Sequence, residues 1–105
     1  MRFTVDELLS ELPKPATEKW KNGVWDVEPF SKGNIKLVFF APRGSDYQTA
    51  HDEDELYFIA RGSAELLIEA VRNTATAGDA FFVPARVPHH FENISSDFAT
   101  WAIFF

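Results

Sequence analysis

The chain has 105 residues, 46% of them hydrophobic and 25% charged, which is the balance of one globular domain rather than of a disordered segment. It contains no cysteine, which excludes disulfides, thiolate metal ligands and a cysteine nucleophile. The net charge of −6 at pH 7 argues against a nucleic-acid partner, because phosphate backbones require a basic surface.

The first residues predict neither a secretion signal nor a membrane anchor. Residues 1–7 include two acids where a signal peptide requires an apolar core. No apolar run approaches the roughly 20 residues of a membrane-spanning helix. We therefore expect a cytoplasmic protein with no membrane partner, and the absence of cysteine fits that expectation.

One short helix is predicted near the N-terminus. Thr4 and Glu7 have the spacing of a capping box, in which a hydroxyl and a carboxylate satisfy the free N–H groups of the first turn. Three leucines follow on one face, and Pro13 predicts the end of the helix after about two turns. Residues 1–22 are thus expected to form a helix and a polar lead-in segment.

From residue 24 onward the pattern becomes that of β-strands. The segments are short, rich in aromatic and β-branched residues, and separated by turns that contain Gly, Asn, Asp and Ser. Many short strands with regular turns are typical of a sandwich or barrel, so we predict one all-β domain over residues 1–105. The predicted strands are 24–28, 35–41, 56–60, 64–69, 74–77, 80–83, 89–93 and 98–105.

All three histidines of the chain lie next to predicted strands. His51 and Glu55 flank the entry to strand 56–60, where alternation can turn Glu55 inward, and an inward carboxylate requires a partner or a metal. The acids between them are interpreted as a solvated turn. His89 begins strand 89–93 after two prolines, and alternation places His90 on the opposite face. Imidazole and carboxylate groups are ordinary ligands of divalent transition metals.

These residues resemble the two motifs of the cupin family. The match covers about residues 44–93, and both motifs occur in order on a strand-rich chain. The first motif is matched by His51, Glu55 and Gly62, and the second by Gly78, Pro84, His89 and Asn93. The resemblance implies a jelly-roll barrel, also called a double-stranded β-helix, preceded here by the short helix.

The resemblance also implies a metal site with three of the four usual protein ligands, His51, Glu55 and His89. Thr49 stands where the first motif histidine is expected, and Arg86 stands at a position that is usually glycine. Two histidines and one carboxylate suit iron, manganese, nickel or zinc. Gln48, one residue from the vacant position, is either a fourth oxygen donor or substrate contact, or a turn residue facing water.

Alternation along the strands suggests which residues line a substrate pocket. Tyr57 shares a face with Glu55, while Phe91 and Asn93 share one with His89. We add Trp101 from the last strand and Thr49 as a pocket wall. Plain core packing is the competing interpretation for the aromatic residues.

Three functions remain open from the sequence. The first is a metal-dependent enzyme that acts on a small organic molecule, as a non-haem dioxygenase or as an isomerase or lyase. The second is a binding or sensing barrel whose metal is structural or absent, which Thr49 favours because fewer ligands bind a metal more weakly. The third is a metal-free barrel with an interaction role. Both faces of strand 98–105 are apolar, which predicts a homodimer.

Overall fold

The structure is a computed structural model that describes residues 1–105. It contains one short helix and eight strands, in the order that the sequence predicts. The elements are α1 (Val5–Leu9), β1 (Asp26–Lys32), β2 (Ile35–Phe40), β3 (Glu55–Arg61), β4 (Ser63–Ile68), β5 (Val71–Thr76), β6 (Ala80–Val83), β7 (His89–Glu92) and β8 (Ala99–Phe104).

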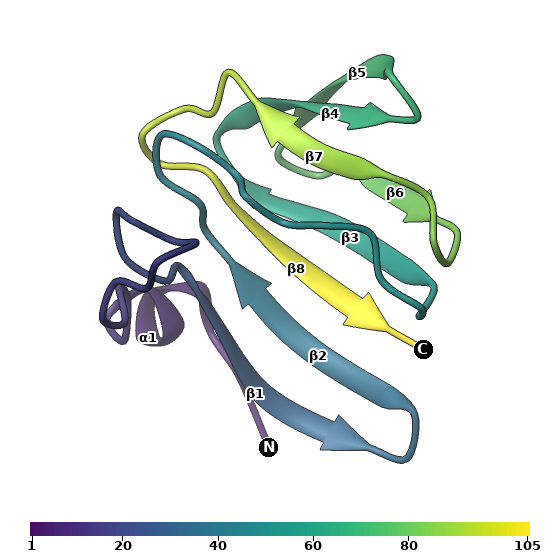
Figure 1. The fold of residues 1–105 in the computed structure, drawn as a ribbon. Coiled ribbons are helices and arrows are strands. Elements are labelled where there is room, and N and C mark those ends of the chain that lie inside the picture. Colours follow the sequence, from purple (N-terminus) through teal and green to yellow (C-terminus); the bar gives the residue numbers. More distant parts are fainter.

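The strands form two antiparallel sheets that face each other, which is the jelly-roll arrangement (Figure 1). The larger sheet has the order β1-β2-β8-β3-β6, and the smaller has the order β5-β4-β7. β8, the last strand of the chain, pairs with β2 on one side and with β3 on the other. The C-terminal strand therefore joins the two parts of the larger sheet. No helix in the chain has both the length and the apolar character required to cross a membrane.

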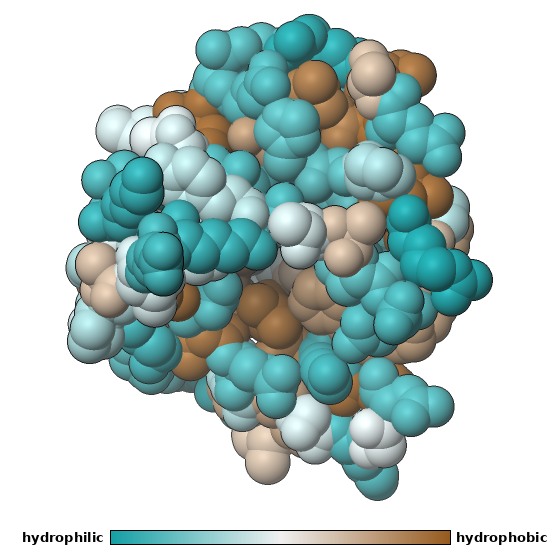
Figure 2. All heavy atoms as spheres, in the orientation of Figure 1, coloured by the Kyte–Doolittle hydropathy of each residue, from teal (hydrophilic) through white to brown (hydrophobic).

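The main core fills the space between the two sheets. It combines inward-facing side chains of both sheets, and the rings of Tyr57 and Phe91 meet in it with centroids 5.0 Å apart. Outward-facing neighbours such as Phe58 are exposed, as the two-residue period of a strand requires. Figure 2 shows one face of the molecule, where apolar atoms lie at the bottom of a hollow between polar residues.

The helix packs on the outer face of the larger sheet, where β2 and β8 pair. Thr4 caps it as predicted, since its hydroxyl accepts a hydrogen bond from the Glu7 N–H at 3.2 Å. Leu8 of the helix is buried against Phe39 of β2, and Trp101 of β8 packs on the edge of the Phe39 ring at 5.1 Å. α1 is only five residues long, so this packing rather than helix propensity stabilises it.

Candidate metal centre

Glu55 is a buried carboxylate on the inner face of the larger sheet. It begins β3 and is only 1% exposed, and Tyr57 and Ile59 follow it on the same buried face. The inward orientation predicted from alternation is therefore confirmed. A carboxylate in such a position requires compensating donors or a cation, because burial alone destabilises its charged form.

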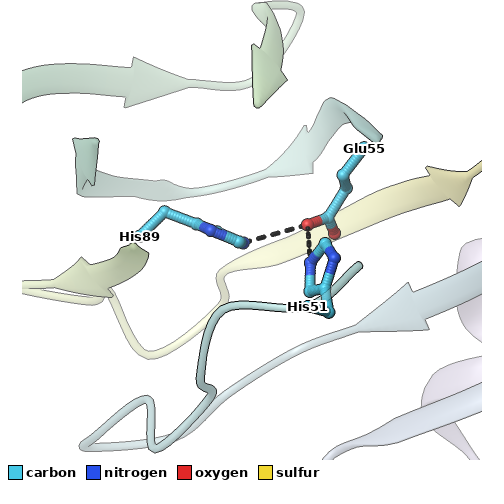
Figure 3. A group of neighbouring side chains, drawn as sticks. All are labelled: His51, Glu55 and His89. Atoms are coloured by element: carbon cyan, nitrogen blue, oxygen red, sulfur yellow. Dashed lines mark hydrogen bonds and ion pairs between the residues drawn. The ribbon is translucent and has the colours of Figure 1, made fainter. Parts of the chain in front are cut away.

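Two histidines approach that carboxylate from different parts of the chain (Figure 3). The Nε2 atoms of His51 and His89 each lie 3.0 Å from the same oxygen, Oε1 of Glu55. His51 precedes β3, whereas His89 begins β7 of the other sheet. The three donor atoms lie within 4.8 Å of one another, so the fold brings together the three ligands that the resemblance implies.

The two segments that carry the histidines are joined by their backbones. The Arg86 N–H donates to the His51 carbonyl at 2.6 Å, and the Ala85 N–H donates to Oδ1 of Asp54 at 2.8 Å. Arg86 has a φ of 65°, the left-handed conformation that glycine adopts most readily, which accounts for the usual residue at this motif position. Asp54, interpreted from the sequence as a solvated turn residue, instead fixes the β6–β7 turn.

The second nitrogen of each ring is held by a backbone carbonyl. Nδ1 of His51 lies 3.0 Å from the Glu53 carbonyl, and Nδ1 of His89 lies 2.9 Å from the Val87 carbonyl. A carbonyl only accepts, so each Nδ1 carries the hydrogen, and in a neutral ring Nε2 then presents a lone pair. Two lone pairs and a carboxylate oxygen facing one another require a positive charge between them. The cluster therefore fits a metal site, and the carbonyls orient its ligands.

The electrostatics of His89 agree with this reading. Burial lowers the pKa of His89, but the hydrogen bonds to Glu55 and the Val87 carbonyl outweigh burial, so the pKa is raised overall. The carboxylate thus favours a positive charge at this point. A divalent cation would supply that charge in place of a proton, so binding should release protons.

Gln48 is held between the half-buried Asp46 and the buried Tyr57. Its Nε2 donates to Oδ2 of Asp46, and its Oε1 accepts from the Tyr57 hydroxyl at 3.2 Å. Burial raises the pKa of Tyr57 well above its usual value, so Tyr57 is a neutral donor and not a base. The amide oxygen of Gln48 retains one free lone pair, which fits a contact to a bound molecule.

Asp46 anchors this arrangement and was missed in the sequence analysis. Its Oδ2 also accepts from the Phe91 N–H at 2.8 Å, and its Oδ1 accepts from the Gln48 N–H at 3.0 Å. Burial raises the pKa of Asp46, partly offset by these hydrogen bonds. The spacing of Asp46, Gln48 and His51 could have identified it. An aspartate often accepts a hydrogen bond from the backbone N–H two residues later, which forms a turn and orients the residue at that position.

A cavity of about 240 Å³ opens beside the cluster. This volume is below the roughly 300–1,000 Å³ of pockets for drug-sized ligands, so it suits a small molecule. Gln48 and Thr49, both expected in the pocket, line it together with His51 and Glu55. The remaining lining residues are Lys19, Trp20, Asp26, Val38, Phe40, Ala102 and Phe104.

The structure places the other expected pocket residues outside this cavity. Tyr57 and Phe91 belong to the buried core, as the competing interpretation had it. Asn93 is exposed and donates to Glu65, since β7 ends at Glu92 and a φ of 50° breaks the alternation. Trp101 faces outward against α1, because Thr100 and Ala102 form the inward set of β8. Asn93 and Trp101 therefore do not line this cavity, and their contact with a substrate stays a prediction.

Comparison with known proteins agrees with these motifs. The family model described as a cupin domain matches residues 36–105, two thirds of the chain. An uncharacterised protein of Streptomyces coelicolor is 33% identical over 60 residues. Those residues are 57% of each sequence, so the match spans little more than half the length of this curated relative.

Solved structures share the fold. KdgF from a Halomonas species superimposes with a TM-score of 0.66 at 20% identity, over 75% of this chain and 74% of that chain. The DMSP lyase DddQ from Ruegeria pomeroyi superimposes with a TM-score of 0.61 at 28% identity. That match covers 72% of this chain but only 40% of the lyase.

Proposed function

Because the chain belongs to the cupin family, we propose that His51, Glu55 and His89 bind one divalent transition metal and that the protein is an enzyme acting on a small organic molecule there. One observation supports the proposal above the others. Two imidazole Nε2 atoms and one carboxylate oxygen face a single point, while backbone carbonyls hold the other ring nitrogens. This donor set suits iron, manganese, nickel or zinc.

The reaction class that we favour is an isomerase or lyase. A bound metal of this kind supplies Lewis-acid polarisation of a substrate oxygen. The neutral Tyr57 hydroxyl fixes Gln48, whose amide faces the same cavity, so the substrate is oriented by a rigid group. The likeness to a structure described as a DMSP lyase supports this class, and a dioxygenase is the alternative that the same donor set permits.

A non-enzymatic binding barrel is the second candidate, and Thr49 is the observation that favours it. It stands at the position of the first motif histidine and lines the cavity without adding an imidazole. Three protein ligands hold a metal less firmly than four. A weakly bound or absent metal would leave a cavity that binds small molecules without chemistry.

The metal proposal is tested by elemental analysis of protein purified without chelator, and by titration of metal-free protein with zinc. We expect one metal per chain. His51→Ala and His89→Ala should each lower zinc affinity at least ~100-fold, or ~2.7 kcal/mol. Gln48→Ala serves as the control and should retain affinity, because its amide is engaged by Asp46 and Tyr57. Loss of binding in Gln48→Ala alone, or no binding by the wild type, would refute the three-ligand site.

We also propose that the protein is a homodimer. Paired residues form an apolar row on the outer face of the larger sheet, beyond the part that α1 covers, and Phe82 at its end is 51% exposed. A second copy would bury this row. The row consists of Leu37, Ile103, Leu56 and Phe82, on β2, β8, β3 and β6.

Light scattering after size exclusion tests the dimer. At micromolar concentration we expect a molar mass twice that of one chain. Phe82→Glu should lower the measured mass toward that of the monomer, because it places a charge in the apolar row. Val71→Glu is the matched control, since Val71 is 63% exposed but belongs to the smaller sheet. A monomeric wild type would refute this assembly.

A further inference from the structure

The segment between α1 and β1 contains a loop whose two ends are joined to each other. The backbones of Lys14 and Val24 pair as an isolated antiparallel bridge, with hydrogen bonds of 2.8 and 3.0 Å. Gly23 turns the chain back into that bridge with a φ of 99°, and a methyl group there would lie 2.9 Å from Cβ of Pro13. The base of the loop is therefore a tightly packed point, and the loop itself lies outside both sheets, beside α1 (Figure 1).

The hydrogen bonds of this loop stay within it and its base. The Thr17 N–H donates to the Trp20 carbonyl at 3.0 Å, and the Trp20 N–H donates to the Thr17 hydroxyl at 2.9 Å. The Trp25 indole, one residue past the base, donates to the Asn22 carbonyl at 3.2 Å. No hydrogen bond or ion pair joins residues 15–23 to either sheet. The loop can therefore move as a unit without breaking a polar contact to the barrel.

One side chain, Trp20, packs the loop onto the main core. Its ring is half-buried and lies edge-on to two others, with centroids 6.1 Å from Phe40 and 5.5 Å from Tyr47. Every other residue from 13 to 22 is exposed. A segment with one partly buried apolar contact belongs to the least stable parts of a structure, which open locally while the rest stays folded.

The same loop forms one wall of the cavity beside the candidate metal centre. Lys19 and Trp20 both line the cavity, whereas its other lining residues belong to the larger sheet or to residues 48–51. Ala102 of β8 is one of them, and it is only 1% exposed, so little solvent reaches this wall. Movement of the loop would withdraw the wall that Lys19 and Trp20 form and open the cavity from that side.

We propose that residues 15–23 are a lid that opens about the Lys14–Val24 bridge, and that Trp20 holds the lid closed. The inference rests on the proposed function for what the cavity binds, whereas the movement of the lid does not depend on it. A molecule that touches Lys19 and Trp20 in the cavity does so only while the lid is closed, so its binding shifts the equilibrium toward closure. Closure then excludes water from the bound molecule.

Labelling of a single thiol tests the lid. The chain has no cysteine, so Ala102→Cys places one thiol on the cavity wall, where the added sulfur has room. Metal-free protein is treated with N-ethylmaleimide, and labelling is followed by mass spectrometry. Trp20→Ala should raise the labelling rate at least ~10-fold, equivalent to ~1.4 kcal/mol in favour of the open lid. Trp20→Phe, which keeps a ring, should give an intermediate rate. Lys21→Ala is the matched control and should change nothing, since Lys21 is an exposed residue of the same loop.

A second thiol separates opening of the lid from unfolding of the barrel. Val83→Cys, a substitution of nearly equal size, places the thiol in the main core at a fully buried position that does not line the cavity. Its labelling should be slower and should not respond to Trp20→Ala. Equal labelling of Ala102→Cys with and without Trp20→Ala, or equal acceleration of both thiols, would overturn the inference. A protein without zinc affinity would refute the proposed function alone, because these rates are measured without metal.

Discussion

Replacing Glu55 with glutamine is expected to weaken zinc binding at least 100-fold while the metal-free protein stays folded. Glutamine has nearly the same shape, so the packing around the position is preserved. It removes the negative charge that both Nε2 atoms face at 3.0 Å, and leaves a neutral carbonyl in its place. Loss of an anionic ligand should exceed the roughly 10–100-fold cost of losing an outer hydrogen-bond partner of a ligand.

The measurement is competition with a zinc chelator, together with thermal unfolding with and without zinc. At a free zinc concentration 100 times its dissociation constant, zinc should stabilise the wild type by about 2.7 kcal/mol, and the Glu55 variant should show almost no such gain. Glu53→Gln is the matched control. Glu53 holds Nδ1 of His51 through its backbone carbonyl at 3.0 Å, which the substitution leaves in place, and its carboxylate lies farther from that nitrogen, at 3.9 Å. Wild-type zinc affinity in Glu55→Gln would rule out a ligand role for Glu55.

The parts of the site that could be predicted from the sequence are those fixed by spacing along one strand. Glu55 and Tyr57 share a buried face because strands alternate, and His89 and His90 separate for the same reason. The side chain of His90 is 40% exposed and pairs with Glu92, on the face opposite His89. Spacing also gave the fold class, since eight short strands with turns leave few architectures.

Strand alternation failed to predict which way a side chain faces where a strand ended early, as at Asn93. It also failed where the helix covers the sheet, as at Trp101. Asn93 continues the pattern of β7 in the sequence, but its left-handed backbone turns the side chain to solvent. For Trp101, both faces of β8 are apolar, so the pattern contained no signal for which face the helix covers. Only the packing of Leu8 from the helix against Phe39 and Trp101 decides it.

Two acids near the site were missed for a different reason. Asp46 and Asp26 lie outside the two motifs, at positions where an acid is most simply read as a turn or surface residue. Their role depends on contacts across the chain: Asp46 bonds the Phe91 backbone, 45 residues away, and Asp26 shares a cavity with Glu55. For Asp26 a local signal existed, because Trp25 and Val27 flank it in a predicted strand and place it on the opposite face.

The motif glycine between β3 and β4 should be the least replaceable residue for stability. Gly62 has a φ of 68°, and a methyl group there would lie 3.0 Å from the Cα of Phe98 and would meet the hydroxyl oxygen of Ser95. Ser95 cannot move aside freely, because its hydroxyl accepts from the Ser63 N–H at 2.9 Å and donates to Asp97 at 2.8 Å. The Phe98 backbone and the hydrogen-bonded Ser95 side chain together leave no space for a methyl group at position 62.

Gly62→Ala is therefore expected to lower the free energy of unfolding by about 2–5 kcal/mol, combining left-handed strain of roughly 1–2 kcal/mol with overpacking of roughly 1–3 kcal/mol. Gly33→Ala is the matched control, with a φ of 57° and no heavy atom within 4 Å of the new methyl group, so it should cost only the strain. Urea unfolding of both variants measures the difference. An equal loss of unfolding free energy in the two variants would show that residues 95–98 move aside for the methyl group. Gly62 would then be required for its backbone conformation alone.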